Sequence, residues 1–416
     1  MTRNRLLTVA IAAAVTAAAA GLPKVRPEET GLSSERLARI QSAMKRYLDR
    51  QDVAGTVTLV ARRGRIAHLE AQGLMDVASA RPIAPDTIFR IASMTKPITS
   101  VAVMMLHEEG RFVLQDPISK FIPEFKDPKV LVPARPGEGL VPSTTIAAER
   151  EITIQHLLTH TAGLANSYTG STVPLAARLV GERTAETTIG EQVRKLAKLP
   201  LEFHPGAAWQ YGPATDVLGH LVEVVSGKSL DQFFRERIFE PLGMTDTFFY
   251  VPDDKLPRLA TAYAPAEPTG IKPLGAAASM RGSRRYFSGA GGLLSTAEDY
   301  FRFSQMLLNG GELDGRRLLS RKSIDLMTAN HIGTARMWPA LTGYRFGLGF
   351  RVMTDLGGGA RLASPGEYGW GGAYATYFFI DPKEQLIGIF MTQLRPYTQV
   401  NIRQEFQNLS YQAIID

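Results

Sequence analysis

The chain has 416 residues, 44% hydrophobic and 21% charged, so it is long enough for a large core, and its composition excludes fibrous and disordered classes. The formal net charge of +7 is not concentrated in any long run of Lys or Arg, which gives nucleic-acid binding little support. The absence of cysteine excludes disulfides, thiolate metal sites and cysteine nucleophiles, and it leaves the redox compartment open.

The first twenty residues are typical of an export signal. Arg3 and Arg5 precede the apolar run LLTVAIAAAVTAAAA, and three alanines at 18–20 form a small-residue cleavage site. A retained Ala-rich N-terminal helix is the alternative. Cleavage predicts a periplasmic or secreted protein, whereas an unprocessed leader predicts a cytoplasmic one. No later apolar run approaches the roughly 20 residues that a membrane-spanning helix needs.

Predicted elements after the leader begin with an amphipathic helix over residues 33–50, which we expect Ser34 to cap. Two β-rich runs follow at 55–64 and 65–73, and the Arg-Gly turn between them predicts a hairpin. The C-terminal part predicts three more strands and a closing helix, at 345–354, 374–382, 385–393 and 399–415.

The middle of the chain is rich in helical periodicity and in Pro- and Gly-containing loops, such as 127–148 and 264–292. The helical segments lie near 100–110, 152–164, 214–227, 230–239 and 295–311. This order predicts an α+β fold, in which both chain ends build one antiparallel sheet flanked by helices. Residues 21–90 and 330–416 are expected to form the sheet lobe, and residues 91–329 an inserted, mainly helical lobe. A cleft between two such lobes is a common place for a site.

Ser93 and Lys96 stand three positions apart in IASMTKPITS, where an extended stretch turns into a helix. Residues at this spacing share a helix face, so the amine is within reach of the hydroxyl and can take its proton or hold a second base nearby. The Ser93 amide at a helix N-terminus favours developing negative charge. A second match, Ser42 to Lys45, lies mid-helix, where the serine amide is already bonded. A capping serine beside a solvated lysine is the alternative.

Tyr211 is a candidate partner for this pair. Gly212 and Pro213 place it on a rigid corner just before a predicted helix, with its phenol free to face a cleft. A solvated lysine is a poor base at neutral pH, so a phenol beside it is a candidate general base on Ser93 and a later acid for the leaving group. A tyrosine that only packs is the alternative.

A glycine-rich stretch, GEYGWGGAYATYFFI, supplies the last candidates. Trp370, Gly371 and Gly372 stand just before a predicted strand, where small residues let a ligand lie against the backbone. The Ala373 amide is a candidate second oxyanion donor beside that of Ser93. A bulge or tight bend with no further role is the alternative.

Other chemistries find less support in the sequence. His156 and His160 are four apart in QHLLTH, but the HExxH glutamate is missing and no third ligand is suggested, so we expect structural roles and no metal. No G-x-S-x-G, P-loop or dinucleotide fingerprint occurs, and no cofactor is expected.

With these motifs in order, the chain resembles the serine β-lactamase-like hydrolases, and specifically class C β-lactamases and family VIII carboxylesterases. S-x-x-K belongs to the signature of penicillin-recognising serine enzymes. The likeness covers nearly the whole chain after the leader and rests on FRIASMTKPITS, ITIQHLLTHTAGL, WQYGPATDVLG, SGAGGLLSTAEDYFRF and YGWGGAYATYFFIDP. It implies the β-lactamase/transpeptidase-like fold. It also implies that Ser93 is the acylated nucleophile and that Lys96 and Tyr211 are the proton-transfer groups. By the same resemblance Ala373 supplies an oxyanion amide, and Trp370-Gly371-Gly372 occupies the K-T-G place.

Two departures from the lactamase pattern shape the expected activity. Pro213 stands where the lactamases usually carry an Asn that binds the lactam amide side chain, and Trp370 replaces the lysine that helps hold the substrate carboxylate. Both changes leave an apolar wall. We therefore expect a serine carboxylesterase acting on small short-chain or aromatic esters. A β-lactamase, D-amino-acid peptidase or acyltransferase with the same residues is the runner-up, followed by a non-catalytic binding protein of the same fold.

Overall fold

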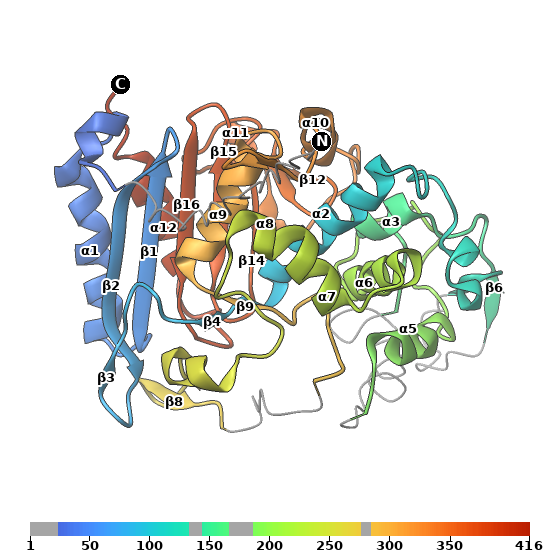
Figure 1. Ribbon diagram of the computed structural model, residues 1–416, viewed down its shortest axis with the longest axis horizontal. Coiled ribbons are helices and arrows are strands. Elements are labelled where there is room, and N and C mark those ends of the chain that lie inside the picture. The colour runs from blue at the N-terminus through green and yellow to red at the C-terminus, as the bar shows by residue number, and fades with distance from the viewer. Residues whose placement is uncertain (1–23, 133–143, 166–185, 276–283) are drawn as a thin grey trace, which may run out of the picture.

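The computed structural model describes residues 24–132, 144–165, 186–275 and 284–416. The predicted leader lies outside these residues. An eight-stranded antiparallel sheet built from both ends of the chain dominates the fold (Figure 1). In spatial order its strands are β12 (Tyr344–Phe346), β13 (Arg351–Met353), β14 (Tyr368–Gly371), β15 (Tyr377–Asp381), β16 (Leu386–Met391), β1 (Gly55–Arg62), β2 (Arg65–Asp76) and β3 (Arg81–Pro82).

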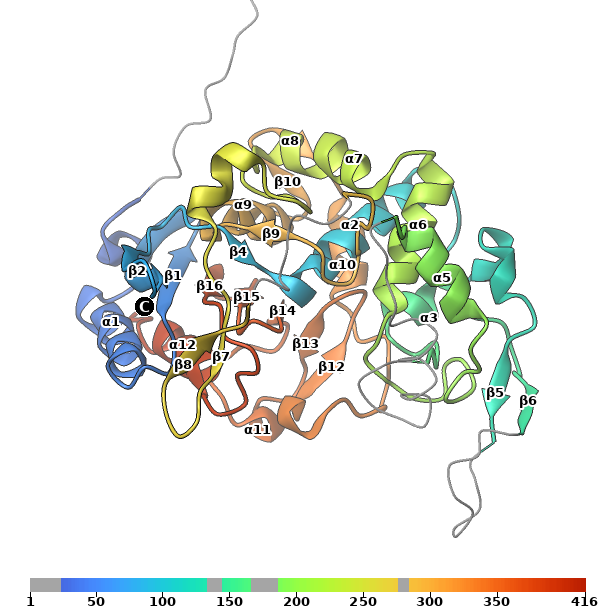
Figure 2. The same ribbon diagram turned by 90° about the horizontal axis from the view of Figure 1, so that it is seen from below.

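Helices cover both faces of this sheet and fill a second region beside it (Figures 1 and 2). The long or site-bearing helices are α1 (Ser34–Asp49), α2 (Thr95–Glu108), α3 (Ile154–Leu158), α5 (Ile189–Ala197), α6 (Ala214–Ser226), α9 (Ala297–Leu308) and α12 (Ile402–Tyr411). The shorter ones are α7 (Leu230–Phe234), α8 (Glu240–Leu242), α10 (Arg321–Met327) and α11 (Leu356–Gly359), with a π-helical turn at Arg235–Phe239.

Short strand pairs complete the architecture: β4 (Phe89–Arg90) with β9 (Leu294–Ser295), β5 (Lys129–Leu131) with β6 (Thr145–Ala147), β7 (Tyr263–Pro265) with β8 (Ile271–Pro273), and β10 (Glu312–Leu313) with β11 (Arg316–Arg317). The first of these pairs holds the segment that leads to Ser93. The predicted loops 127–148 and 264–292 thus contain short strands, because residues of each fold back on a neighbouring segment.

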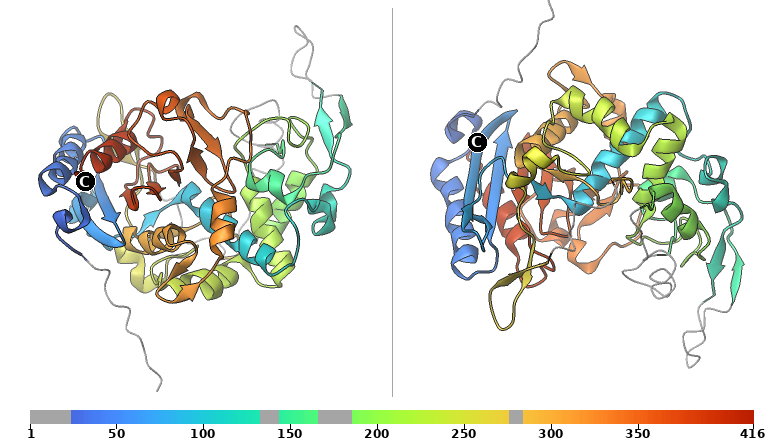
Figure 3. Two further views of the ribbon diagram at one scale, coloured as in Figure 1. Left: turned by 90° about the horizontal axis from the view of Figure 1, so that it is seen from above. Right: turned by 60° about the horizontal axis from the view of Figure 1, so that its bottom comes forward.

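The central strands alternate their side chains between two cores. Val57 and Leu59 of β1 join the larger core with α2 and α9, whereas Val60 faces the smaller core beneath α1 and α12. Because successive side chains of a strand point to opposite faces, a sheet covered on both sides reads as a nearly continuous apolar run. Figure 3 shows α1 beside α12, with the C-terminus next to them.

The α+β fold predicted from the sequence is confirmed, with several local corrections, one of which is that the helix predicted near 152–164 is confined to α3. Ser33, not Ser34, caps α1 by accepting a hydrogen bond from the Arg36 amide, because the Ser34 hydroxyl pairs with Glu28 instead. The single strand predicted over 345–354 is two strands, β12 and β13, and the strand predicted over 374–382 is confined to β15. The lobe boundaries at residues 90 and 330 stay a prediction.

A tight turn explains the split between β12 and β13. The Gly347 amide donates to the Phe350 carbonyl at 2.8 Å, and Gly349 has a φ of +95°, which favours glycine. A side chain at Gly349 would come within 2.2 Å of Ser100 Oγ on α2. The turn therefore packs the sheet against the helix that carries Lys96.

A buried polar cluster fixes α12 to the sheet. The Gln407 side-chain amide donates to Glu367 at 2.6 Å, and the Tyr377 hydroxyl donates to Gln407 at 2.7 Å. Arg351 lies 3.4 Å from Glu367, and the Tyr411 hydroxyl donates to the same carboxyl at 3.3 Å. Burial raises the pKa of Glu367 to about 7 although the Arg351 charge opposes the shift.

Candidate active site

Ser93 lies in the 3-10 turn η2 (Ala92–Met94), which follows β4 and directly precedes α2. The helix itself begins at Thr95, so Ser93 lies just before the helix that the sequence predicted it to open. Ala92 has a φ of +44°, a left-handed conformation that residues with a side chain adopt rarely. Backbone strain of this kind is concentrated at functional sites, and here it bends the chain immediately before the serine.

Lys96 is buried in the first turn of α2, with 4% of its surface exposed. Its Nζ donates to Ser93 Oγ at 3.3 Å and to the carbonyl oxygen of Ala290 at 2.6 Å. The same nitrogen lies 4.6 Å from the centroid of the Tyr211 ring. The structure thus brings the serine, lysine and tyrosine predicted from the sequence into one site.

Tyr211 stands on the corner before α6, where Pro213 is the N-cap and not the first helical residue. Its hydroxyl accepts a hydrogen bond from Trp370 Nε1 at 3.3 Å. The backbone before the corner is fixed because the Gln210 amide donates to the His160 carbonyl at 2.9 Å. The phenol therefore has one fixed donor, and the Lys96 amine lies beside its ring.

His160 packs against this tyrosine, with ring centroids 4.8 Å apart. It is 2% exposed, and burial, aided by the Lys96 charge, holds the pKa of its imidazole well below the ordinary value. Its φ of +57° fits the tight bend after α3. The buried imidazole therefore packs against the phenol as a neutral ring.

The loop that holds Lys96 is anchored on Asp216, in the first turn of α6. The Ala290 amide donates to Asp216 Oδ1 at 2.9 Å, and Ser288 Oγ donates to the same oxygen at 2.7 Å. Gly289 adds a contact, since its carbonyl accepts from Thr99 Oγ1 of α2 at 2.7 Å. The N-terminal parts of α2 and α6 thereby hold this loop, and with it the Ala290 carbonyl that accepts from Lys96 Nζ.

Trp370, Gly371 and Gly372 belong to β14 and the turn after it, whereas the sequence predicted that they lie just before a strand. Gly369 pairs with Phe379, and a side chain there would come within 2.3 Å of the Phe378 carbonyl. Trp370 pairs with Phe378. The glycines therefore permit close strand pairing, and the segment extends the sheet to the edge of the site.

Gly372 ties the turn after β14 to the strained turn of Ser93. A side chain at Gly372 would lie 2.2 Å from the Ile91 carbonyl and from Thr376 Oγ1. That threonine donates to the same Ile91 carbonyl at 3.3 Å. The next amide, of Ala373, donates to no backbone or side-chain group among the described residues. The two predicted oxyanion donors thus lie on turns that contact each other.

Aromatic side chains form the wall of the site. Trp338 is 42% exposed, and its ring centroid lies 5.0 Å from that of Tyr211 and 6.2 Å from that of Trp370. Trp209 meets Trp338 edge to face at 5.2 Å, and Phe346 supports Trp370 from behind. Trp370 itself is only 5% exposed, so the exposed aromatic surface of this wall is mainly that of Trp338.

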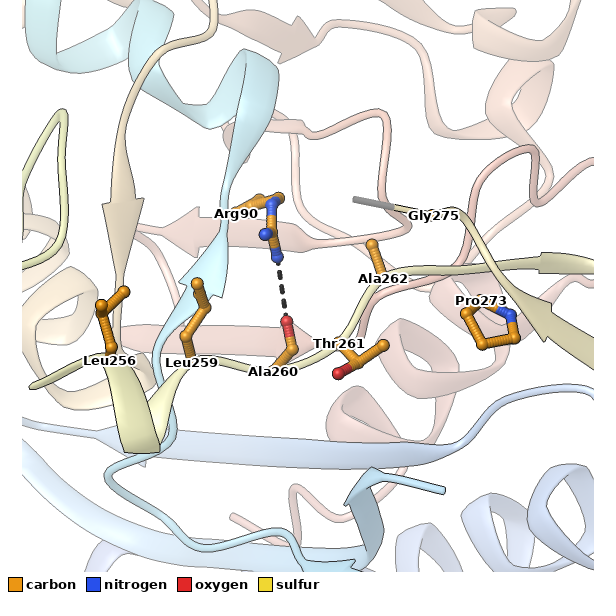
Figure 4. A pocket seen from close by; sticks show the side chains of 8 residues that line it. All are labelled: Arg90, Leu256, Leu259, Ala260, Thr261, Ala262, Pro273 and Gly275. Atoms are coloured by element: carbon orange, nitrogen blue, oxygen red, sulfur yellow. Dashed lines mark hydrogen bonds between the residues drawn. The ribbon is translucent and has the colours of Figure 1, made fainter. Parts of the chain in front are cut away.

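A separate hollow of about 380 Å³ lies beside β4 (Figure 4). Its walls are largely apolar and include Leu256, Leu259 and Pro273. Arg90, three residues before Ser93, extends into it and donates to the Ala260 carbonyl at 2.9 Å. None of the three predicted reactive residues lines this hollow, so it is distinct from the candidate site.

The other residues considered in the sequence analysis lie in surroundings typical of the protein surface or of a helix cap. Ser42 is exposed in the interior of α1, and Lys45 pairs with Asp49 at 2.6 Å. His156 completes a capping box at the start of α3, where its Nδ1 accepts from the Thr153 amide. No cluster of potential metal ligands occurs within the described ranges. Among those residues, too, no helix has the length and apolar character required to span a membrane.

Comparison with known proteins decides the family. The sequence profile described as Beta-lactamase matches residues 40–412, which is most of the chain. This protein belongs to the β-lactamase family. The resemblance drawn from the sequence motifs is therefore confirmed.

Relatives within and around the β-lactamase family share most of the length of the chain. Protein Rv1367c of Mycobacterium tuberculosis is 36% identical, covering 87% of this chain and 91% of its own. Esterase EstB of Burkholderia gladioli is 31% identical, covering 83% and 87% respectively. The solved structure of EstCE1, described as a hydrolase with promiscuous acyltransferase activity, has a TM-score of 0.76 at 26% identity and covers 92% and 99%.

Sequence reasoning missed several residues of this site. Asp216, five positions after Tyr211, could have been found from the sequence, because it stands in the first turn of a predicted helix, where a carboxylate is favoured. Trp338 carried no such signal, because it comes to the site from a distant segment.

Proposed function

We propose that this protein is a serine esterase that hydrolyses short-chain or aromatic carboxylic esters through an acyl-enzyme on Ser93. The observation that carries the proposal is the contact of Lys96 Nζ with Ser93 Oγ at 3.3 Å beside the Tyr211 ring. A nucleophile with a base in reach, itself oriented by further groups, is the arrangement that acyl transfer requires.

In the first half-reaction Ser93 Oγ attacks the ester carbonyl carbon, and its proton passes to the Lys96–Tyr211 pair. The carbonyl electrons move onto oxygen, and the amides of Ser93 and Ala373 bind that oxyanion. When the electrons return, the bond to the alkoxy group breaks, and the leaving oxygen takes the proton to give the alcohol. The acyl group stays on Ser93.

In the second half-reaction a water molecule gives a proton to the same pair and attacks the acyl carbon. Collapse of the second tetrahedral intermediate breaks the bond to Ser93 Oγ, which takes the proton back. The carboxylic acid leaves and the serine is restored, so the cycle needs no cofactor. Lys96 and Tyr211 act as one coupled pair in both halves.

The surroundings favour an ester over a charged amide. Pro213 offers no side-chain donor at the position where a lactam amide would be bound, and Trp370 offers no cation for a substrate carboxylate. The exposed ring of Trp338 extends the apolar wall. Similarity to Esterase EstB supports the same choice.

The test is kinetics on nitrophenyl acetate and butyrate with Ser93→Ala, Lys96→Ala and Tyr211→Phe. We expect kcat/KM to fall by about a hundredfold or more in each. Ser42→Ala is the matched control, because it breaks the second S-x-x-K pattern on the exposed side of α1. We expect this variant to keep full activity. Near-wild-type turnover in any of the three site variants contradicts the assignment.

Acyl transfer is the second candidate, favoured by the likeness to EstCE1, a hydrolase with promiscuous acyltransferase activity. An alcohol takes the place of water in the second half-reaction and yields a new ester. Product analysis in added alcohol separates the two outcomes. Side-by-side kinetics on nitrocefin and on D-amino-acid peptides tests for β-lactamase and peptidase activity, and lactam turnover above that on every ester reverses the ranking.

Export to the periplasm or the medium is also part of the proposal, although residues 1–20 lie outside the described residues. N-terminal sequencing of protein from the periplasm or medium should begin at Gly21. Mature protein that still begins at Met1 contradicts this part.

A further inference from the structure

Arg403 makes a polar contact with the site that the proposed reaction does not use. It projects from the first turn of α12, and its Nη2 donates to the carbonyl oxygen of Gly372. Its Nη1 donates to the Tyr397 hydroxyl, and its guanidinium carbon lies 3.9 Å from the Tyr397 ring centroid. The guanidinium thus has one fixed partner outside the site and one in the turn after β14.

The Gly372 carbonyl and the Ala373 amide belong to one peptide group. In a trans peptide the C=O and N–H bonds are coplanar and point in opposite directions. A group that fixes the carbonyl therefore fixes the direction of the N–H as well. Arg403 lies on the carbonyl side, and the N–H faces away from it.

We propose that Arg403 is a positioning residue for the oxyanion site, which holds and polarises the Gly372–Ala373 peptide so that its N–H meets the developing negative charge. This rests on the proposed esterase function. A hydrogen bond from a cation to a carbonyl withdraws electron density from the peptide and strengthens the donor at its other end. Arg403 touches no reacting atom and acts through this peptide.

The close packing around Arg403 supports a positioning role. A side chain at Gly371 would come within 2.8 Å of Arg403 Nη1, so the glycine makes room for the guanidinium. The preceding peptide of the turn is held because the Gly372 amide donates to the Thr376 carbonyl at 2.8 Å. Thr376 therefore holds the peptide before Gly372, and Arg403 holds the carbonyl of the Gly372–Ala373 peptide.

The contacts of α12 with the sheet hold the helix firmly enough for Arg403 to have this role. Gln407, one turn after Arg403, is bonded to Glu367 beneath the sheet at 2.6 Å. A helix tied into a buried polar cluster keeps the arginine in place during turnover. Because the guanidinium is planar and permanently charged, it presents its donors in a fixed geometry that a lysine lacks.

The experiment compares Arg403→Ala and Arg403→Lys with Gln404→Ala, an exposed control on the same helix. The readouts are kcat and KM on nitrophenyl butyrate, and the Ki of an alkyl trifluoromethyl ketone, which forms an oxyanion on the serine. Loss of a whole oxyanion donor costs about 10²–10³ in kcat, so loss of its orienting partner should cost about tenfold in Arg403→Ala. The ketone Ki should rise by the same factor while KM stays within about twofold.

Added guanidinium ion at millimolar concentration should restore part of the kcat of Arg403→Ala and leave Gln404→Ala unaffected. Unchanged kcat, an effect on KM alone, or unchanged ketone affinity overturns the inference. If Arg403→Ala does not fold, Arg403→Lys decides, since it keeps the charge but loses the geometry and should show a smaller loss of the same kind. An inactive Ser93→Ala with normal Arg403 variants refutes only this inference, whereas an active Ser93→Ala refutes the proposed function.

Discussion

Removing the Asp216 carboxylate should impair the positioning of Lys96, although Lys96 itself is unchanged. Asp216 Oδ1 holds the loop through Ser288 Oγ at 2.7 Å and the Ala290 amide at 2.9 Å. The carbonyl of Ala290 in turn receives Lys96 Nζ at 2.6 Å. In Asp216→Ala these two donors lose their acceptor, as does the Tyr286 hydroxyl, which donates to Asp216 Oδ2 at 3.4 Å, and the carbonyl that positions the amine is released.

The magnitude follows from the two shorter bonds, which join Asp216 to Ser288 and Ala290. A hydrogen bond to a charged group contributes about 1.5–3 kcal/mol, and Asp216 is partly exposed, so Asp216→Ala should lower the free energy of unfolding by about 2–3 kcal/mol. A displacement of about 1 Å at a catalytic group costs about a hundredfold in rate. We therefore expect kcat on nitrophenyl butyrate to fall by about a hundredfold, with little change in KM.

Two milder variants grade the effect. Asp216→Asn keeps an oxygen acceptor at the same place and should lose less than about tenfold in kcat. Ser288→Ala removes one donor and leaves the Ala290 amide and the Tyr286 hydroxyl bonded to Asp216, so its kcat should be close to that of Asp216→Asn. Steady-state kinetics and thermal unfolding measured on the same preparations test the series. A folded Asp216→Ala variant with wild-type kcat refutes the reasoning.

Three further predictions concern the wall, the turn and the buried cluster. Trp338→Ala should lower kcat/KM for phenyl-substituted esters about tenfold more than for acetate, since its exposed ring borders Tyr211; equal losses on a substrate panel would count against a specificity role. Gly372→Ala should abolish activity and lower Tm, because the added methyl group would meet the Ile91 carbonyl at 2.2 Å; an active variant would show that the turn has no fixed geometry. The pKa of Glu367 is raised from 4.5 to about 7 on folding, so the folded state binds the extra proton and stability should decline by up to about 3 kcal/mol as pH rises through that window. Denaturant unfolding of Glu367→Gln should lack this slope, and an unchanged slope would assign it to other groups.

The parts of the fold that could be predicted are those that local sequence encodes. The hairpin of β1 and β2 was visible because two β-rich runs flank Arg63-Gly64, and the helix bearing Lys96 because its apolar positions recur at helical spacing. The split of 345–354 was missed although Gly347 and Gly349 interrupt the run, because a glycine within a strand can mark a bulge as well as a turn. Only the packing of Gly349 against Ser100 shows that a turn is required there.

The candidate site divides in the same way. Ser93 and Lys96 share a motif, and Tyr211 has its own rigid corner, so their residue types and spacing pointed to one chemistry. Asp216 and Arg403 act through partners 74 and 31 residues away, and no local pattern links such positions. Their roles follow from tertiary contacts, which a single sequence does not reveal.

The most direct test of the central claim is to find where the acyl group resides. After reaction with a nitrophenyl alkyl phosphonate, mass spectrometry of the intact protein and its peptides should show one adduct, on Ser93, with stoichiometric release of nitrophenol. Lys96→Ala and Tyr211→Phe should label much more slowly, and Ser42→Ala at the normal rate. An adduct on another residue, or ester hydrolysis that continues with Ser93 unmodified, contradicts the account.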